Sequence, residues 1–414
     1  VERSRGLGDV YKRQAMNPQD APVILAWARS PVAPVGGALR ELAAHELGAP
    51  VLQALLARAG LPARAVDAVV LGNALGAGGN PARMLALAAG LPERCAAHSV
   101  DTQCCSGLDS VALAAGLLLS GQADIVVAGG AEAWSRAPIR QTRPRHAGEL
   151  PVTYDRPAFA PDPVRDPDLL QSAADHALAH GITRAVQEAH AIHSHALALA
   201  HRDRLAQEIV PMAGLDHDAY PRALNPARVA RMPVVAEAAG AVDAHARQRH
   251  ALSTPTISPK ADGAALVLLA TPQACARLGL QPRARWVASA SLGHAPETPL
   301  VAAALAAQQV LERAAAALQL PRLTAAELQA VELHDAFAVQ ALAFAETLGL
   351  PLQQLNTGGG GLARGHPIGA SGAVALVRML CDLHRTPAAH RPALGLAAIA
   401  GAGGIGAACL VQAL

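Results

Sequence analysis

The chain has 414 residues, of which 52% are hydrophobic, 2% aromatic and 16% charged, and its formal net charge is +2. A chain of this length can bury a large core in two or three packed units, and the scarcity of aromatic residues implies that Ala, Leu and Val fill that core. The small net charge gives no reason to expect nucleic acid or an anionic membrane as a partner. Six cysteines without regular spacing are typical of free thiols in a reducing compartment, so we expect a cytoplasmic protein.

The two ends of the chain need separate interpretation. Residues 1–15 are polar and charged without an apolar core, unlike a secretory signal. They precede Met16 and differ in pattern from the rest of the chain, so we interpret them as a non-native or disordered extension. Residues 392–414 carry no charge and are the only stretch long enough to suggest a membrane span. Five glycines interrupt this stretch, which predicts a buried hairpin of strand, glycine turn and strand.

Apolar periodicity predicts alternating strands and helices from residue 16 onwards. The expected strands and helices of the first part are strands over Val23–Arg29, Val66–Leu71, His98–Gln103 and Ala123–Gly129, and helices over Ala38–Gly60 and Pro81–Gly90. From about residue 136 to 250 the composition changes: Pro, Arg, His and Asp are dense and apolar strands are absent. We therefore predict an inserted loop domain over 136–250, with helices at Ala173–His180 and Arg184–His201.

The strand pattern resumes at Gly263–Thr271, and after a break near Gln281–Pro282 the same theme repeats. The expected elements of this second part are strands over Arg285–Ser291 and Ala330–Leu333, helices over Val301–Leu318, Ala338–Leu348 and Ala373–Leu383, and the terminal hairpin. Two α/β halves with similar element order predict a duplicated fold, with an N-terminal domain over 16–271 and a C-terminal domain over 283–414. Each half would contribute loops to one shared site at the strand ends.

A cysteine pair, Cys104-Cys105, lies between a short polar run and the amphipathic segment Leu108–Ser120. A strand that ends and a helix that begins there would place a sulfur at a helix N-terminus, where unpaired N–H groups and the positive dipole end favour thiolate. Ser106 and Gly107 are small, so a substrate carbonyl could approach closely. The pattern is typical of a nucleophile that becomes acylated, although two adjacent cysteines are equally compatible with buried apolar residues.

A glycine-rich loop about 260 residues downstream supplies a second candidate. His366, followed by Pro367, lies among seven glycines between Gly358 and Gly372. Such a density of glycine weakens structure unless backbone or ligand must come close, which disfavours a plain turn. Another glycine-rich turn follows at Ala400–Gly406. A cysteine, a histidine and a turn that presents backbone N–H groups are the parts that thioester chemistry needs.

With these motifs the chain resembles the thiolase family. Cys104-Cys-Ser-Gly-Leu is similar to the family's nucleophile motif Cys-Gly/Ala-Ser-Gly-Leu/Met, residues 356–372 to its Gly-His-Pro block, and residues 400–406 to its last glycine-rich block. Further similar segments occur in the family's order: Pro34–Gly48, Gly72-Asn73 with Asn80–Arg83, Gly181–His195, Glu208–Pro211 and Asp262–Ala264. The resemblance covers roughly residues 23–414. It implies the thiolase fold, an α/β architecture of two similar α-β-α-β-α layered halves.

The resemblance also implies roles for individual residues. Cys104, rather than Cys105, takes the nucleophile position, and Cys105 stands where the family has a small packing residue. His366 would deprotonate Cys104 and later assist release of the acyl group. The backbone N–H groups of Cys104 and of the turn formed by Gly401, Ala402 and Gly403 would hold the thioester oxyanion.

Three further positions match thiolase contacts with coenzyme A. Ser258 and Arg222 fall where thiolases contact the pantetheine and nucleotide ends of coenzyme A, and Phe337 would line the same channel. Coenzyme A is thus expected as a substrate, not as a permanently bound cofactor. The histidines between His176 and His201 invite a metal interpretation, but no Cys or carboxylate set accompanies them in ligand spacing, so no metal is expected.

Two departures from the family pattern bear on the reaction. His334-Asp-Ala-Phe337 replaces the Asn-Glu-Ala-Phe of degradative and biosynthetic thiolases, and a His there can polarise a thioester oxygen or order a water. Ala400 occupies the position of the second catalytic cysteine, and Ala336 the position to which sterol-carrier-type enzymes move that thiol. A positioned acid/base typically contributes about 10²–10⁴ in rate, so carbon–carbon chemistry must use His334 or be impaired.

The implied function is acyl transfer on coenzyme A thioesters through a cysteine acyl-enzyme, most simply 3-ketoacyl-CoA thiolysis or acetyl-CoA condensation. One alternative is a thiolase-like enzyme that finishes by acyl-CoA hydrolysis or by decarboxylative condensation, in which loss of CO₂ generates the carbanion without a base. Another is a non-catalytic acyl-CoA-binding or scaffold subunit. By the same resemblance we expect acyl-CoA and coenzyme A as the small-molecule partners and a homodimer or homotetramer.

Overall fold

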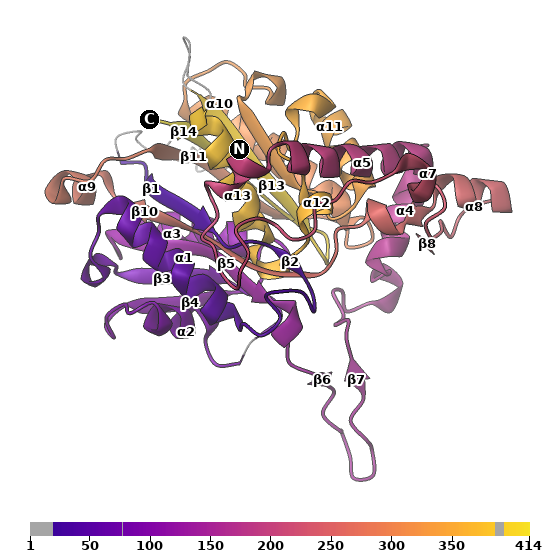
Figure 1. The fold of residues 1–414 in the computed structure, drawn as a ribbon, viewed down its shortest axis with the longest axis horizontal. Helices are drawn as coiled ribbons and strands as arrows, with labels where there is room; N and C mark the ends of the chain where they lie inside the picture. The colour runs from indigo at the N-terminus through magenta and orange to yellow at the C-terminus, as the bar shows by residue number, and fades with distance from the viewer. Residues whose placement is uncertain (1–19, 77, 386–392) are drawn as a thin grey trace, which may run out of the picture.

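The computed structural model describes residues 20–76, 78–385 and 393–414 (Figure 1). The extension predicted at residues 1–15 lies outside them. The described residues form one ten-stranded sheet with helices on its faces. Its strands, in spatial order, are β12 (Ala330–His334), β13 (Leu394–Gly401), β14 (Ile405–Ala413), β11 (Ala284–Gly293), β1 (Val23–Arg29), β10 (Ala261–Ala270), β5 (Ile125–Ala133), β3 (Ala68–Gly72) and β4 (Ala96–Val100); β2 (Ala33–Pro34) pairs with β10.

The sheet joins an N-terminal and a C-terminal half through β1. This strand runs antiparallel to β10 along its whole length and meets β11 through only two residue pairs, Val23 with Arg285 and Ile24 with Ala284. Each half mixes both pairing modes: β3 is parallel to β4 and β5, and β12 is parallel to β13, whereas β5–β10 and β13–β14 are antiparallel. The terminal hairpin predicted from the glycine-interrupted stretch is the β13–β14 pair. Among the described residues, no helix combines the length and apolar character needed to cross a membrane.

The helices form three layers, and each half of the sheet lies between the central layer and one outer layer (Figure 1). In the central layer, α3 (Ser106–Leu119) and α13 (Ser371–Arg385) pack on each other and on residues of both halves. The outer layers contain α1 (Ala44–Ala59) and α2 (Pro81–Ala88) on the N-terminal half, and α10 (Ala302–Ala317) and α11 (Ala338–Leu348) on the C-terminal half. Neighbouring residues of β5 face different cores: Val126 belongs to the central core and Val127 to the outer one. The predicted α-β-α-β-α architecture is confirmed.

Glycines allow the two central helices to approach at their N-terminal ends. A Cβ atom at Gly107 would lie 3.0 Å from the backbone nitrogen of Ala373, and one at Gly372 would lie 2.8 Å from the Cβ of Leu108. A Cβ at Gly107 would also lie 2.8 Å from the Gly369 carbonyl oxygen. Contacts of 2.8 Å are closer than a Cβ atom tolerates, so glycine is required at both positions. The loop before α3 and the loop before α13, which carry the predicted nucleophile and base, are therefore brought side by side.

A buried ion-pair network ties α13 to the N-terminal half. Glu208 accepts from Arg29 of β1 at 2.6 Å and from Arg378 of α13, and Arg29 also pairs with Asp218 at 2.6 Å. Although burial raises it, the pKa of Glu208 is held below its usual value by Arg378 and Arg29. The pairing compensates for the cost of burying these charges, so the network fixes α13 in position.

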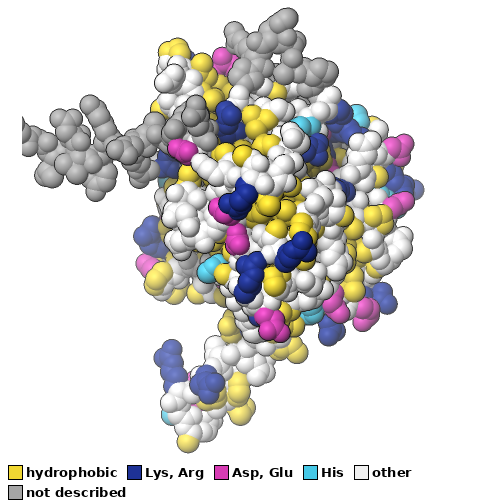
Figure 2. All heavy atoms as spheres, turned by 90° about the vertical axis from the view of Figure 1, so that its left-hand side faces the viewer, with side chains coloured by type: hydrophobic (Ala, Val, Ile, Leu, Met, Phe, Trp, Pro, Cys, Tyr) yellow, Lys and Arg dark blue, Asp and Glu magenta, His cyan; other side chains and the backbone are white. Residues whose placement is uncertain are grey.

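The region between residues 136 and 250, which was predicted to be an insertion, contains mostly short elements. They are β6 (Arg140–Gln141), β7 (Thr153–Tyr154), α4 (Leu169–Ala179), α5 (Arg184–Ala200), α6 (Arg202–Ala206), α7 (Pro226–Val229), β8 (Val234–Ala236) and α8 (Ala244–His250), followed by β9 (Leu252–Ser253). The helices α4 and α5 pack against α11 of the C-terminal half. The remaining helices are α9 (Pro272–Leu278) and α12 (Gly361–Arg364). The β6–β7 hairpin projects from the body of the molecule (Figure 1), and Figure 2 shows basic side chains at its end, where Arg143 and Arg145 are exposed.

Several predicted boundaries were wrong: the strand predicted to end at Gln103 ends at Val100, the helix predicted from Ala173 begins at Leu169, and two further boundaries have a clear physical cause. The first helix begins at Ala44, not Ala38, because the backbone N–H of Ala43 donates to the Glu46 carboxylate at 2.8 Å, which caps the helix there. Strand β5 continues past Gly129 to Ala133 because β10 pairs with it along its full length. Gly130 lies inside this strand because a Cβ there would come within 2.1 Å of the Gly369 carbonyl oxygen.

Candidate active site

Cys104 and His366 meet where the two central helices begin. Cys104 directly precedes Cys105, the residue that caps α3, and His366 lies five residues before the first residue of α13. The Cys104 Sγ is 3.2 Å from the His366 Nε2. A sulfur and an imidazole nitrogen at this distance can exchange a proton directly, as a nucleophile and its base must.

The other nitrogen of the His366 ring contacts a hydroxyl group that sets the tautomer. The His366 Nδ1 is 2.7 Å from the Ser371 Oγ, and the Ser371 hydroxyl donates to the Pro367 carbonyl at 3.1 Å. Since the Ser371 proton is used in that bond, its oxygen accepts from Nδ1–H. The Nε2 nitrogen is then unprotonated and faces the Cys104 thiol as an acceptor.

Backbone N–H groups surround the sulfur on another side. The backbone N–H groups of Ala402 and of Cys104 itself lie near enough to the sulfur to lower the pKa of the Cys104 thiol. Of the three turn residues predicted to hold an oxyanion, Gly401 and Ala402 line the same cavity as Cys104, whereas Gly403 packs against Phe159. The Ala402 N–H is therefore the turn donor closest to the position where a thioester oxyanion would form.

Burial decides the protonation state of the pair. Desolvation raises the pKa of the Cys104 thiol to about 12, even though the N–H groups of Ala402 and Cys104 lower it. Desolvation also lowers the pKa of His366 to about 4. Desolvation therefore opposes the resting thiolate that the helix N-terminus was expected to favour. At neutral pH the site holds a neutral thiol beside a neutral imidazole.

Cys105 lies in the core instead of the cavity. Its side chain is 1% exposed, and its sulfur lies 3.7 Å from the Ile399 carbonyl oxygen and 3.9 Å from that of Ile405. Only the Cys104 sulfur of this pair reaches the cavity.

His334 stands behind His366. It ends β12, is 3% exposed, and its ring stacks on that of His366 with centroids 4.3 Å apart. Burial, His366 and Arg364 hold the pKa of His334 well below its usual value. His334 is not among the residues that line the cavity, so the geometry gives no support to the predicted contact with substrate. Ala400 and Ala336 do line it, and Cys104 supplies the only thiol among its described lining residues.

A cavity of about 560 Å³ opens at Cys104 and His366. The predicted residues Ser258 and Phe337 line it, and the Ser258 hydroxyl donates to the Gly361 carbonyl at 2.7 Å. Arg222 does not line it: its guanidinium lies over the Tyr220 ring, 4.1 Å from the centroid, and donates to the Tyr220 hydroxyl at 3.1 Å. The predicted contact of Arg222 with coenzyme A therefore has no support in this cavity. Within the described part of the chain, no group of three or more His, Cys, Asp or Glu is arranged to hold a metal ion.

The sequence interpretation did not identify Glu132, a buried carboxylate beneath the site. It accepts from the Asn73 side chain at 2.7 Å and from the backbone N–H groups of Ala74 at 2.8 Å and Gly369 at 2.9 Å. Burial raises the pKa of Glu132 to about 7. The carboxylate thus joins the loop after β3 to the loop before α13. The sequence signal that could have identified Glu132 is its position as a single acidic residue inside an otherwise apolar strand.

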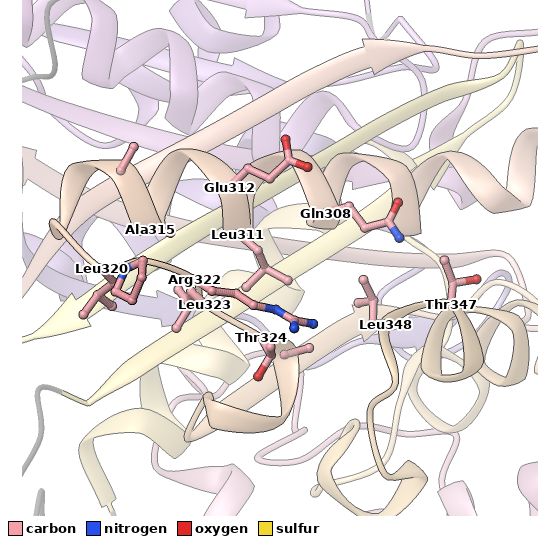
Figure 3. Close-up of a pocket in the computed structure, with 13 residues that line it drawn as sticks. Gln308, Leu311, Glu312, Ala315, Leu320, Arg322, Leu323, Thr324, Thr347 and Leu348 are labelled. Carbon is pink, nitrogen blue, oxygen red and sulfur yellow. The ribbon is translucent and has the colours of Figure 1, made fainter.

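A second cavity, of about 730 Å³, lies between α10 and the C-terminal end of α11 (Figure 3). Residues such as Leu311, Leu323 and Leu348 line it together with Glu312 and Arg322. The described residues that line it include no cysteine and no histidine. Nucleophilic chemistry is therefore assigned to the smaller cavity at Cys104.

Comparisons with known proteins agree with this geometry. Residues 22–273 match the model of the thiolase N-terminal domain, and residues 280–413 that of the thiolase C-terminal domain. The acetyl-CoA acetyltransferase of Allochromatium vinosum is 33% identical over 398 residues (94% of this chain, 98% of the relative), and that of Cupriavidus necator is 32% identical over 407 residues (94% and 98%). The crystal structure of Acat5 thiolase from Ascaris suum in complex with coenzyme A is similar with a TM-score of 0.83 and 28% identity, covering 95% of this chain and 100% of that one. The chain belongs to the thiolase family and is an acyltransferase of the thiolase class.

Proposed function

We propose that this enzyme transfers acyl groups between coenzyme A thioesters through an acyl-enzyme on Cys104, and that its reaction is 3-ketoacyl-CoA thiolysis or the reverse condensation. The observation that carries the proposal is the 3.2 Å contact between the Cys104 Sγ and the His366 Nε2 at the cavity wall. The relatives named acetyl-CoA acetyltransferases and the similar thiolase in complex with coenzyme A support the choice of substrate.

The first half-reaction begins with a neutral pair. His366 Nε2 takes the thiol proton as the Cys104 sulfur bonds to the keto carbon of the substrate. The Ala402 and Cys104 N–H groups stabilise the oxyanion. The carbon–carbon bond then breaks, which leaves the acyl group on Cys104 and a carbanion on acetyl-CoA that must receive a proton. Among the cavity groups of the structure, the protonated His366 is the donor in contact with the sulfur, so we assign that proton to His366.

The second half-reaction uses the same base. His366 takes the proton of an incoming coenzyme A thiol, whose sulfur attacks the Cys104 thioester. The acyl–Cys104 bond breaks and the Cys104 sulfur recovers the proton from His366. His334 would act through its stacked ring, by holding the His366 imidazole in direction, rather than on the substrate.

Decarboxylative condensation is the second candidate, and one observation favours it. Ala400 and Ala336 occupy the two positions where related enzymes carry a second thiol, and both line the cavity. Loss of CO₂ generates a carbanion without a base, so that reaction would not need the thiol. The intact Cys104–His366–Ser371 chain disfavours a purely structural subunit.

Intact-mass measurement of the enzyme with acetyl-CoA tests the proposal. The protein should gain one acetyl group, and the gain should be absent in Cys104→Ser. Acetoacetyl-CoA should then be cleaved only when coenzyme A is added. No acetyl gain at all would refute the acyl-enzyme, and acylation followed only by malonyl-CoA-dependent condensation would select the second candidate. Coenzyme A as a substrate without a resident cofactor, a homodimer or homotetramer, and a cytoplasmic location remain predictions.

A further inference from the structure

Lysine is almost absent from this chain. Of its 34 basic residues only Lys12 and Lys260 are lysines, and the rest are arginines. Lys260 is the only lysine within the described residues, and it lines the cavity that contains Cys104. A chain that supplies nearly all its positive charge with arginine thus places an ammonium group in its catalytic cavity.

Lys260 belongs to the same wall as the catalytic base. Its backbone forms a parallel bridge with His366, and the next residue, Ala261, donates its N–H to the His366 carbonyl at 3.3 Å. The Lys260 Nζ lies 4.6 Å from the centre of the Trp134 ring, and the Trp134 Nε1–H donates to the same His366 carbonyl at 3.1 Å. The ammonium is therefore held by a cation–π contact beside the histidine that faces Cys104.

The positive charge on this wall has no carboxylate partner in the described structure. Lys260 has the Trp134 contact and no ion pair, and the Arg140 guanidinium donates only to the carbonyls of Ala74 and Leu75, at 3.3 and 3.0 Å. By contrast, Arg156, which also lines the cavity, is paired with Asp166.

Two acidic residues, Asp155 and Asp168, also line the cavity. Asp168 caps α4 by accepting from the backbone N–H groups of Leu170 and Gln171, so its carboxylate is already used. Neither residue forms an ion pair with Lys260 or Arg140. Lys260 is exposed at the cavity wall and forms no ion pair with a described residue, so its ammonium is free to bind an anionic group of a ligand.

We propose that Lys260 binds a carboxylate carried by the acyl chain of the substrate, so that the preferred substrates are thioesters of dicarboxylic acids. This inference rests on the proposed Cys104 acyl-enzyme. Lys260 is a backbone neighbour of His366, so its side chain reaches groups a few bonds from the thioester carbon. The phosphates of coenzyme A lie at the far end of the pantetheine arm. In acylation the carboxylate stays unchanged: the Cys104 sulfur bonds to the carbonyl carbon, and coenzyme A leaves as a thiol with the proton relayed by His366.

Two acyl-CoA esters of equal chain size separate charge from shape. Succinyl-CoA and 4-methylpentanoyl-CoA have acyl groups with the same number of heavy atoms, but only the first carries a carboxylate. The rate of Cys104 acylation is measured by intact mass for the wild type and for Lys260→Met, which keeps an unbranched side chain one atom shorter and removes the charge. Lys260→Met should slow succinylation by about 10- to 100-fold, the range of a charge-assisted hydrogen bond. The rate of 4-methylpentanoylation should stay within about twofold of the wild-type rate, a change well below the effect of one such bond.

Two further variants serve as controls. Lys260→Arg keeps the charge and should retain most of the preference for succinyl-CoA. Arg249→Met removes an exposed cation on α8 that does not line the cavity, and it should change neither rate. Equal unfolding temperatures of wild type and Lys260→Met exclude a folding defect.

The other outcomes overturn the proposal. Equal slowing of acylation by both esters would mean that Lys260 acts on the coenzyme A moiety or on His366. The measurement would then be repeated with 3′-dephospho-CoA thioesters, and loss of the slowing would identify a phosphate contact. A wild type that prefers the neutral chain, or a Lys260→Met variant that retains the succinyl preference, would also overturn it. If neither ester acylates Cys104, the proposed acyl-enzyme is rejected. If 4-methylpentanoyl-CoA acylates Cys104 normally and succinyl-CoA does not, only the role of Lys260 is rejected.

Discussion

The imidazole rings of His334 and His366 are stacked, with centroids 4.3 Å apart and planes inclined by 25°. His366 extends from the loop before α13, and His334 from the end of β12, so the stack joins the C-terminal sheet to the central helix layer. Since burial keeps both rings neutral at neutral pH, they pack without charge repulsion. The stack directs His366 Nε2 toward Cys104 while the Ser371 hydroxyl holds its Nδ1.

Cys104→Ser should abolish covalent acylation, because a serine hydroxyl is far harder to deprotonate than a thiol and His366 is a weak base. Cys105→Ala should leave acylation largely intact, because its sulfur lies in the core against the carbonyls of Ile399 and Ile405. Intact-mass spectrometry after incubation with acetyl-CoA distinguishes the two. The reverse pattern would show that the nucleophile has been assigned one residue too early.

The pH dependence of acylation should follow His366. Burial lowers the pKa of this imidazole to about 4, and only the neutral form accepts the Cys104 proton. The acylation rate should therefore stay nearly constant as the pH falls from neutral to about 5, and drop with a midpoint near 4. Rapid-quench mass spectrometry across this range measures it. A midpoint near 6.5, the value of a solvated histidine, would show that the ring is hydrated in solution.

The same shift affects stability. The unfolded chain binds a proton on His366 below about pH 6.5, whereas the folded protein does so only below about 4. Between these values the unfolded state holds more protons than the folded state. The contribution of His366 to the free energy of unfolding therefore falls as the pH decreases through this window. Thermal unfolding of wild type and His366→Gln at pH 7 and pH 5 tests this. The wild type should lose more stability on acidification, and equal losses would contradict the lowered pKa.

Ser371→Ala should slow acylation by about tenfold or more, because the ring then loses the acceptor that fixes its tautomer. Ser371→Thr keeps the hydroxyl and should restore most of the rate. The KM for acetyl-CoA should be unchanged in Ser371→Ala, since the hydroxyl contacts His366 and the Pro367 carbonyl rather than the cavity. A loss that appears only in KM would contradict a positioning role.

Much of the fold could be predicted because its strands are continuous apolar runs, as in Val23–Arg29 and Ile125–Val127, and such runs have few alternatives to a buried sheet. The end of β5 could not be predicted, because Gly129 and Gly130 look like the end of a strand until the close approach of Gly369 is known. The candidate site followed from the family resemblance at Cys104 and His366. The contact of Lys260 with Trp134 joins residues 126 positions apart, and no local pattern specifies such a pair.

Gly130→Ala should destabilise the protein by about 1–3 kcal/mol, the cost of overpacking a well-packed interior, because its Cβ would overlap the Gly369 carbonyl oxygen at 2.1 Å. Gly116→Ala is the matched control. Gly116 lies within α3, and a Cβ there would have nothing within 4 Å, so alanine should stabilise the helix by about 0.5–1 kcal/mol. Urea unfolding measures both. Equal effects of the two substitutions would mean that the backbone around Gly369 yields without cost.

The missing second thiol gives the most decisive prediction for catalysis. Ala400 lines the cavity beside the Gly401–Ala402 turn, so Ala400→Cys would add a sulfur next to the acylated Cys104. If proton transfer to the carbanion limits the wild type, acetoacetyl-CoA cleavage should rise by up to about two orders of magnitude, while the acylation rate by acetyl-CoA stays unchanged. Ala400→Ser, with a much weaker acid in the same place, is the matched control and should give little gain.

His334→Asn decides which residue moves that proton in the wild type. Because His334 stacks behind His366 and does not line the cavity, the substitution should slow acylation and carbon–carbon cleavage by the same factor, both in the wild type and in Ala400→Cys. A loss confined to cleavage, and rescued by Ala400→Cys, would instead make His334 the acid/base that acts on the substrate. Rapid wild-type cleavage that neither substitution alters would contradict both assignments, since the described cavity has no other thiol or imidazole at the Cys104 sulfur.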